Sequence, residues 1–187
     1  LYVVSTNAGD SGKKVFIEGL DSNYDYYTEE VTLAGLTAVA TTGNFIRIWT
    51  ATVTSASNSS ANAGEITFHL TSGTGTVVAH IGAGLGITKL SQFTVPRGYS
   101  AYVQYGDCTA FYAGAGNVGA LLKMMVRPFG GAFVAGFIAE VAAGNPYRNE
   151  FKFPMKLPAK SDVDVRITVD TSNTKATCNW QIVLYPD

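Results

Sequence analysis

The chain has 187 residues, a formal net charge of −1, 47% hydrophobic residues and only 14% charged residues. This length allows one large β domain or two small ones, with enough buried surface for an independent core. The near-zero net charge excludes the broad basic surface by which proteins bind nucleic acid or anionic membranes. The charged fraction lies well below the usual value of about a quarter. We therefore expect a surface made of small polar residues and partly covered by other subunits.

Short runs of β-branched and aromatic residues, separated by Gly, Pro, Asn, Asp and Ser, follow one another along the chain and predict strands. In chain order they are Leu1–Ser5, Val15–Leu20, Tyr24–Leu33, Asn44–Val53, Glu65–Leu70, Thr76–Ile81, Gln92–Val95, Tyr99–Tyr105, Thr109–Ala113, Gly119–Arg127, Ala132–Ala142, the alternating segment 151–156, Val163–Val169 and Thr177–Tyr185. Spacings of about 8–15 residues are typical of a sandwich or barrel. We predict an all-β fold, an antiparallel, jelly-roll-like β-sandwich, as a single domain over residues 1–187.

Helix and membrane signals are weak throughout the sequence. The best helical candidate, Asn117–Val126, is short, is stopped by Pro128 and also fits a strand. No run of about 18 apolar residues occurs, so we expect no transmembrane helix. No secretory signal is visible. Because the chain begins in a strand-like segment without a Met, we expect that further sequence precedes Leu1.

Two cysteines, Cys108 and Cys178, are too few for a disulfide scaffold. We expect two buried thiols. A single bridge remains the alternative, because spacing in the sequence does not decide whether two cysteines pair.

The predicted strand Ala132–Ala142 is apolar on both faces, and so is the strand before it, apart from Lys123 and Arg127. In an antiparallel sheet one face normally meets water. Apolar residues on both faces indicate either a central strand under a long loop or a subunit interface. The candidate interface residues are Leu121, Met125, Phe133, Val134, Phe137 and Ile138.

Three short motifs resemble nucleotide or metal sites, but each lacks neighbouring residues or elements that such a site requires. Residues 114–119 match G-x-G-x-x-G, but Pro128 cuts short the helix that a dinucleotide site needs. The Asp21-x-Asn23-x-Asp25 run opens like a calcium loop but lacks its glycine and its final glutamate. His69 and His80 fall on separate predicted strands without a third ligand. We therefore expect no catalytic, cofactor-binding or metal-binding residues and no cofactor.

Two binding or catalytic patterns stay open at the sequence level. Paired carboxylates for glycoside hydrolysis are separated in space rather than in sequence, so Glu18, Asp21, Glu29 and Glu30 remain nominal candidates. A patch of exposed tyrosines is the second pattern, because tyrosine combines an apolar ring with a polar tip. Its members would be Tyr24, Tyr26, Tyr27, Tyr99, Tyr102 and Tyr105. Ordinary cross-strand packing is the alternative explanation.

Several turn-and-strand motifs, in order over most of the chain, resemble a family of virion structural proteins of tailed bacteriophages. They are Ile17-Glu18-Gly19-Leu20-Asp21, Glu30-x-Thr32-Leu33-x-Gly35, Thr41-Thr42-x-x-Phe45-x-Arg47-Ile48, Phe93-Thr94-Val95-Pro96-x-Gly98, Val126-Arg127-Pro128-Phe129-Gly130-Gly131 and Leu157-Pro158-Ala159-Lys160-Ser161-Asp162-Val163. The segment Thr174–Asp187 has no counterpart. The family's motifs are not catalytic, so no catalytic residue carries over.

The resemblance implies a β-sandwich on the phage particle surface, most simply a non-enzymatic capsid decoration (cement) protein that stabilises the head lattice. The partners it implies are the major capsid protein and copies of the chain itself, as a homotrimer, with no nucleic acid and no membrane. A fibre or spike module that binds a host surface glycan or protein is the alternative.

Overall fold

The computed structural model describes residues 1–54, 61–112, 119–169, 171 and 173–187. Over these residues the chain is almost entirely antiparallel β, with one short 3-10 turn, η1, at Ala8–Asp10, so the all-β prediction is confirmed. The chain divides into two compact units, Leu1–Leu90 and Ser91–Asp187, where the sequence predicted one sandwich over residues 1–187. Each unit has two sheets with hydrophobic residues buried between them. A jelly-roll connectivity stays a prediction.

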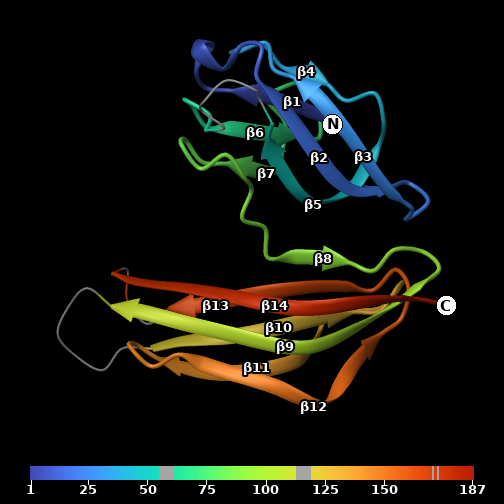
Figure 1. Cartoon of the computed structure of the whole chain (residues 1–187), viewed down its shortest axis with the longest axis vertical. Helices are drawn as coiled ribbons and strands as arrows, with labels where there is room; N and C mark the ends of the chain where they lie inside the picture. The colour runs from blue at the N-terminus through green and yellow to red at the C-terminus, as the bar shows by residue number, and fades with distance from the viewer. Residues whose placement is uncertain (55–60, 113–118, 170, 172) are drawn as a thin grey trace. The chain divides into compact units, whose positions relative to one another are not determined.

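The first unit is built from seven short strands in the part that the structure describes (Figure 1). They are β1 (Tyr2–Ser5), β2 (Lys14–Asp21), β3 (Tyr26–Thr32), β4 (Val39–Ala40), β5 (Phe45–Val53), β6 (Ile66–His69) and β7 (Val77–Ile81). One sheet has the order β4-β1-β6-β7 and the other β3-β2-β5. The sequence did not predict β4 or η1, because both are too short to show a periodic pattern.

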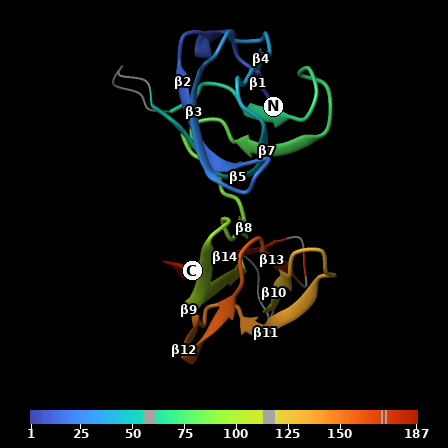
Figure 2. The ribbon, with the colours of Figure 1, turned by 90° about the vertical axis from the view of Figure 1, so that its right-hand side faces the viewer.

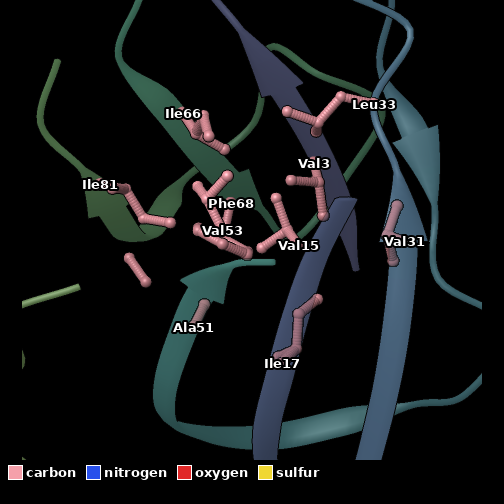
Figure 3. Packing of buried hydrophobic residues seen from close by; sticks show 11 residues of the cluster. Val3, Val15, Ile17, Val31, Leu33, Ala51, Val53, Ile66, Phe68 and Ile81 are labelled. Carbon is pink, nitrogen blue, oxygen red and sulfur yellow. The ribbon is translucent and has the colours of Figure 1, made fainter. Parts of the chain in front are cut away.

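The alternation of buried and exposed side chains along each strand explains how the two sheets of the first unit pack together. In β2 the side chains of Val15 and Ile17 are fully buried, whereas Lys14 is exposed and Glu18 is partly buried. The facing sheet supplies Ile66 and Phe68 from β6, and Figure 3 shows these side chains pointing toward Val15 and Val53. Residues two apart on a strand point to the same side, so one apolar set from each sheet fills the space between them.

The second unit repeats this plan, and Figure 2 views its strands nearly end-on. Most of its strands are longer than those of the first unit. They are β8 (Gln92–Thr94), β9 (Tyr99–Tyr112), β10 (Gly119–Arg127), β11 (Val134–Ala142), β12 (Tyr147–Leu157), β13 (Asp162–Val169) and β14 (Thr174–Pro186). The sheets have the orders β11-β10-β13-β8 and β12-β9-β14. The two predicted strands Tyr99–Tyr105 and Thr109–Ala113 are one long strand, β9, up to Tyr112.

Strict alternation identifies β10 as a strand rather than the helix that Asn117–Val126 allowed. Ala120, Leu122, Met124 and Val126 are buried, and the residues between them are half-buried. The buried side chains pack against apolar residues of β9, such as Val103. A helical arrangement would bury positions three or four apart instead.

The two cysteines form a disulfide, which corrects the expectation of two free buried thiols. Cys108 on β9 and Cys178 on β14 are direct partners in the strand register. They are 70 positions apart in the sequence. The bridge therefore fastens the last strand of the chain to the central strand of its sheet.

Candidate interaction surfaces

Three of the six candidate interface residues lie on the outer face of the sheet that contains β10. Leu121 and Met125 are half-buried there, since Lys123 and Arg127 alternate with them along the strand. Ile138 on β11 is paired with Lys123, and its side chain is 54% exposed. Long charged side chains cover neighbouring apolar surface with their methylene groups, so this outer face is less apolar than the sequence indicated.

A fourth candidate, Phe133, covers part of the same face from the β10–β11 connection. Its ring centroid lies 4.8 Å from the guanidinium carbon of Arg127 and 5.4 Å from that of Arg166. These cation–π contacts hold the ring against the sheet. The sequence left open whether a loop covers the second apolar face of these strands. At the end of the sheet, the connection that carries Phe133 does so in part.

A bulge lies between the remaining two candidates, Val134 and Phe137. Met124 pairs with Phe137 and Met125 with Ala135, so Gly136 is an extra residue in β11. Phe137 turns inward and contacts Phe151 and Trp180 with ring centroids 5.8 and 5.9 Å away. Val134 pairs with Val126 and is 56% exposed at the end of the strand. Phe137 is therefore a core residue, and the six candidates do not form one surface.

A row of polar residues crosses three strands of this sheet and was missed by sequence reasoning. Asp162 on β13 accepts a hydrogen bond from Nε of Arg127 at 2.8 Å and from Oγ1 of Thr94 at 2.6 Å. The register places Arg127, Asp162 and Thr94 opposite one another on β10, β13 and β8. The nearly buried carboxylate thus has charged and neutral donors, as buried charges require.

The six candidate tyrosines do not form a single patch. Tyr24, Tyr26 and Tyr27 belong to the first unit, where Tyr26 stacks on Trp49 with ring centroids 5.6 Å apart. The others belong to the second unit, and of these Tyr102 makes an edge contact with Tyr185 at 5.4 Å. Cross-strand aromatic packing, the alternative explanation, accounts for the Tyr102–Tyr185 pair, whereas Tyr26 and Trp49 stack across the intervening strand β2.

A second β-bulge brings tyrosines of β9 onto one face. Val103 pairs with Ile182 and Tyr105 with Gln181, so Gln104 is an extra residue. Tyr102 and Tyr105, three positions apart, therefore both point outward, while Val103 and Gly106 are buried. We call the outward face of β12-β9-β14 the tyrosine face. Its residues include Tyr102, Tyr105, Asp107, Phe111, Arg148, Glu150, Lys156, Lys175, Asn179, Gln181, Val183 and Tyr185.

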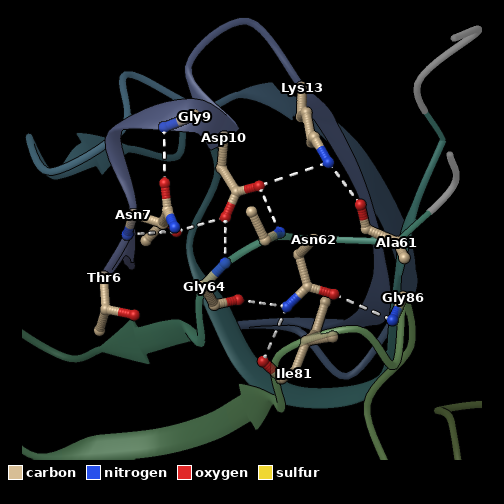
Figure 4. Close-up of polar contacts among 12 residues, drawn as sticks. Thr6, Asn7, Gly9, Asp10, Lys13, Ala61, Asn62, Gly64, Ile81 and Gly86 are labelled. Atoms are coloured by element: carbon tan, nitrogen blue, oxygen red, sulfur yellow. Dashed lines mark hydrogen bonds and ion pairs between the residues drawn. The ribbon is translucent and has the colours of Figure 1, made fainter.

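A polar network among the described residues of the first unit surrounds Asp10 (Figure 4). Its fully buried carboxylate accepts hydrogen bonds from Oγ of Ser5 at 2.6 Å and from the backbone N–H groups of Ala63 and Gly64 at 2.7 and 2.9 Å. Lys13 Nζ lies 3.4 Å away. Burial works to raise the pKa of Asp10, but these donors outweigh it and hold the pKa below its ordinary value.

Asn62 extends the Asp10 network toward β7. Its amide nitrogen donates to the carbonyl oxygens of Gly64, Gly82 and Ile81 at 2.5, 3.0 and 3.2 Å, and its Oδ1 accepts from the N–H of Gly86 at 3.0 Å. Every polar atom of this side chain is used in joining loops. Asp10 and Asn62 therefore hold loops of the first unit together, and their polar atoms are engaged in structural hydrogen bonds.

The nominal glycosidase acids are each occupied by a neighbour. Tyr26 donates to Glu18 at 2.6 Å, and Asp21 caps its own turn by accepting from the N–H groups of Asn23 and Asp25. A hydrogen bond from Lys14 lowers the pKa of Glu30. For Glu29, burial acts in the opposite direction, but the N–H groups of Thr42 and Gly43 prevail and its pKa is lowered. A glycosidase needs one acid with a raised pKa, which neither Glu29 nor Glu30 provides.

Metal and nucleotide motifs gain no support from the geometry. Over residues 1–54, 61–112 and the other described segments, no three His, Cys, Asp or Glu side chains converge as metal ligands would. Nδ1 of His69 faces the carbonyl of Gly75 at 2.8 Å, and His80 lies 3.7 Å from Glu65. The G-x-G-x-x-G match at 114–119 lies, except for Gly119, outside the described residues.

Comparisons with protein-family profiles, curated proteins and solved structures found no match to this chain. In the segments that the structure describes, no helix is long and apolar enough to cross a membrane.

Proposed function

We propose that the chain is a non-enzymatic virion structural protein, a decoration protein that binds a phage head lattice and copies of itself, as a homotrimer. The observation that carries the proposal is the exposed apolar edge strand β11. Among the described residues β11 pairs with β10 alone, and Val134 and Ile138 are both more than half exposed. An unpaired apolar edge is a ready site for another chain.

The bulge at Gly136 restricts how a partner chain could cover the exposed apolar residues of β11. Because it places Val134 and Ile138 on opposite sides of the strand, a partner that lay on one face would cover only one of them. A partner that lay along the edge would cover both, by strand addition and flanking apolar contacts. Two further observations support assembly into a shell: the low charged fraction of the chain and the resemblance described above. Many copies on a closed shell gain avidity without a tight single contact.

Lysine at both exposed positions of β11 tests the proposal. We expect the double variant Val134→Lys/Ile138→Lys to lose the trimer in light scattering and to bind particles lacking the chain at least about tenfold more weakly than the wild type. Lysine is well tolerated on free strand edges, so the variant should still fold.

Leu36→Lys is the matched control, since Leu36 lies in the first unit with a side chain that is 65% exposed. It should trimerise and bind particles as the wild type does. A wild-type chain that is monomeric at all concentrations and never co-sediments with particles would refute the proposal.

A further inference from the structure

The tyrosine face offers aromatic surface that its own packing leaves accessible. Tyr185 is 53% exposed, and its ring meets Tyr102 edge-on at 5.4 Å. Tyr105 is the third ring, with the guanidinium of Arg148 lying 4.7 Å from its centroid. Rings presented in this way pack against surfaces that are apolar in the middle and polar at the rim. The C–H face of a pyranose ring has that character.

Carboxylate, amide and guanidinium groups lie beside these rings, and contacts with one another fix their positions. Asp107 accepts from the hydroxyl of Tyr105 at 2.8 Å and from the amide of Asn179 at 3.0 Å. Its neighbour in the register, Arg148, pairs with Glu150 at 3.0 Å. The hydrogen bond from Tyr105, followed by that from Asn179, lowers the pKa of Asp107. The centre of the face thus presents the carboxylates of Asp107 and Glu150, whose oxygens accept hydrogen bonds from hydroxyl groups.

Cations without a carboxylate partner lie at the rim. Within the described part of the chain, Lys156 makes a 5.9 Å contact with the ring of Tyr102 but no ion pair, and Lys175 at the far end makes none either. Residues 91–187 hold nine Lys and Arg against seven Asp and Glu, whereas residues 1–90 hold four against seven. An anionic ligand would therefore be drawn to the second unit rather than to the first.

We propose that the tyrosine face binds an acidic oligosaccharide. Its sugar rings pack on Tyr102 and Tyr185, its hydroxyl groups donate to Asp107 and Glu150, and its carboxylates pair with Lys156. Single-stranded nucleic acid also combines rings with negative charge. Inside a DNA strand no sugar hydroxyl group is free to donate to the two central carboxylates, whereas an oligosaccharide is rich in such donors. This binding activity goes beyond lattice attachment and does not depend on it.

Calorimetric titration of the whole chain with oligogalacturonate, cello-oligosaccharide and oligothymidylate tests this proposal. We expect oligogalacturonate to bind and the other two to bind at least about tenfold more weakly. Tyr185→Ala should weaken oligogalacturonate binding by about tenfold. Lys156→Gln should weaken it a few-fold and flatten its dependence on salt concentration.

Two substitutions in the first unit are matched controls. Tyr26 is 56% exposed, close to the 53% of Tyr185, so Tyr26→Ala removes a comparable ring from another sheet. Lys89→Gln removes an exposed lysine outside the tyrosine face. Both should bind oligogalacturonate like the wild type. Equal binding of the neutral oligosaccharide, tighter binding of oligothymidylate, no binding at millimolar concentration, or equal losses in the control variants would each overturn the proposal.

Discussion

Replacement of Asp10 by alanine should destabilise the first unit by about 3–5 kcal/mol. The substitution leaves the hydroxyl of Ser5 and the N–H groups of Ala63 and Gly64 without their acceptor. Each buried donor left unsatisfied costs about 1–3 kcal/mol. Urea unfolding followed by the fluorescence of Trp49, in a Trp180→Phe background, measures the effect in the first unit alone.

The Trp180→Phe background leaves Trp49 as the single tryptophan, so the fluorescence reports the unfolding of the first unit. The sequence has two tryptophans, one in each unit. Nε1 of Trp180 is buried without a hydrogen-bond partner, so phenylalanine loses no hydrogen bond there. Glu65→Ala is the control, because it removes a half-exposed carboxylate 3.7 Å from His80 and should change stability by less than about 0.5 kcal/mol. An equal effect of Asp10→Ala and Glu65→Ala would contradict the importance of the network.

The pH dependence of stability gives the Asp10 network a separate signature. The folded pKa of Asp10 is lowered, so its stabilisation is fully present above the unfolded pKa, near 3.8, and is lost as the pH falls through the folded value. Asp10→Asn cannot titrate and should lose about 2 kcal/mol at neutral pH. Its stability should then fall less steeply than that of the wild type below pH 3.8. Parallel pH profiles for the two proteins would show that another group titrates.

Local patterns predicted the strands well because each has one buried face, which alternation makes visible. In β2, for example, Val15 and Ile17 are buried whereas Lys14 and Glu18 are not, and that alternation can be read from the residues alone. A β-bulge makes this prediction fail, because one extra residue in a strand exchanges the inward-facing and outward-facing positions beyond it. The bulge at Gly136 turned Phe137 inward, and the bulge at Gln104 turned Tyr105 outward.

Long-range contacts account for the other differences. Asp10 meets Ala63 and Gly64 more than fifty positions away, and no local signal marks either residue. The division after Leu90 lies between segments that resemble any other strand and turn of the chain. Arg127 and Asp162 are 35 positions apart in the sequence, yet the register joins them across two strands. Which residues meet across a sheet depends on strand order, which composition and periodicity leave open.

Removal of the disulfide should destabilise the second unit by about 2–4 kcal/mol, since a bridge across a long loop restricts the unfolded chain. Cys108 and Cys178 close a loop of 70 positions and join β14 to β9. The double variant Cys108→Ala/Cys178→Ala, with Trp49→Phe, reports the loss through Trp180, which lies on β14 two positions after Cys178. Small apolar replacements suit this site, because Cys108 is buried among Ala110 and Leu122.

Reduction supplies an independent version of the disulfide experiment. A chain with the bridge should yield no reactive thiol when unfolded without reductant and two when unfolded with it. Wild type with reductant should then unfold at the urea concentration of the double variant without reductant, and the double variant should not respond to reductant. The first unit contains no cysteine, so when both comparisons are repeated with Trp49 kept and Trp180→Phe in its place, the transition reported by Trp49 should stay unchanged. Two thiols in the unreduced chain would restore the expectation drawn from the sequence. A shift in the Trp49 transition would mean that the loss of the bridge is felt beyond the unit that contains it.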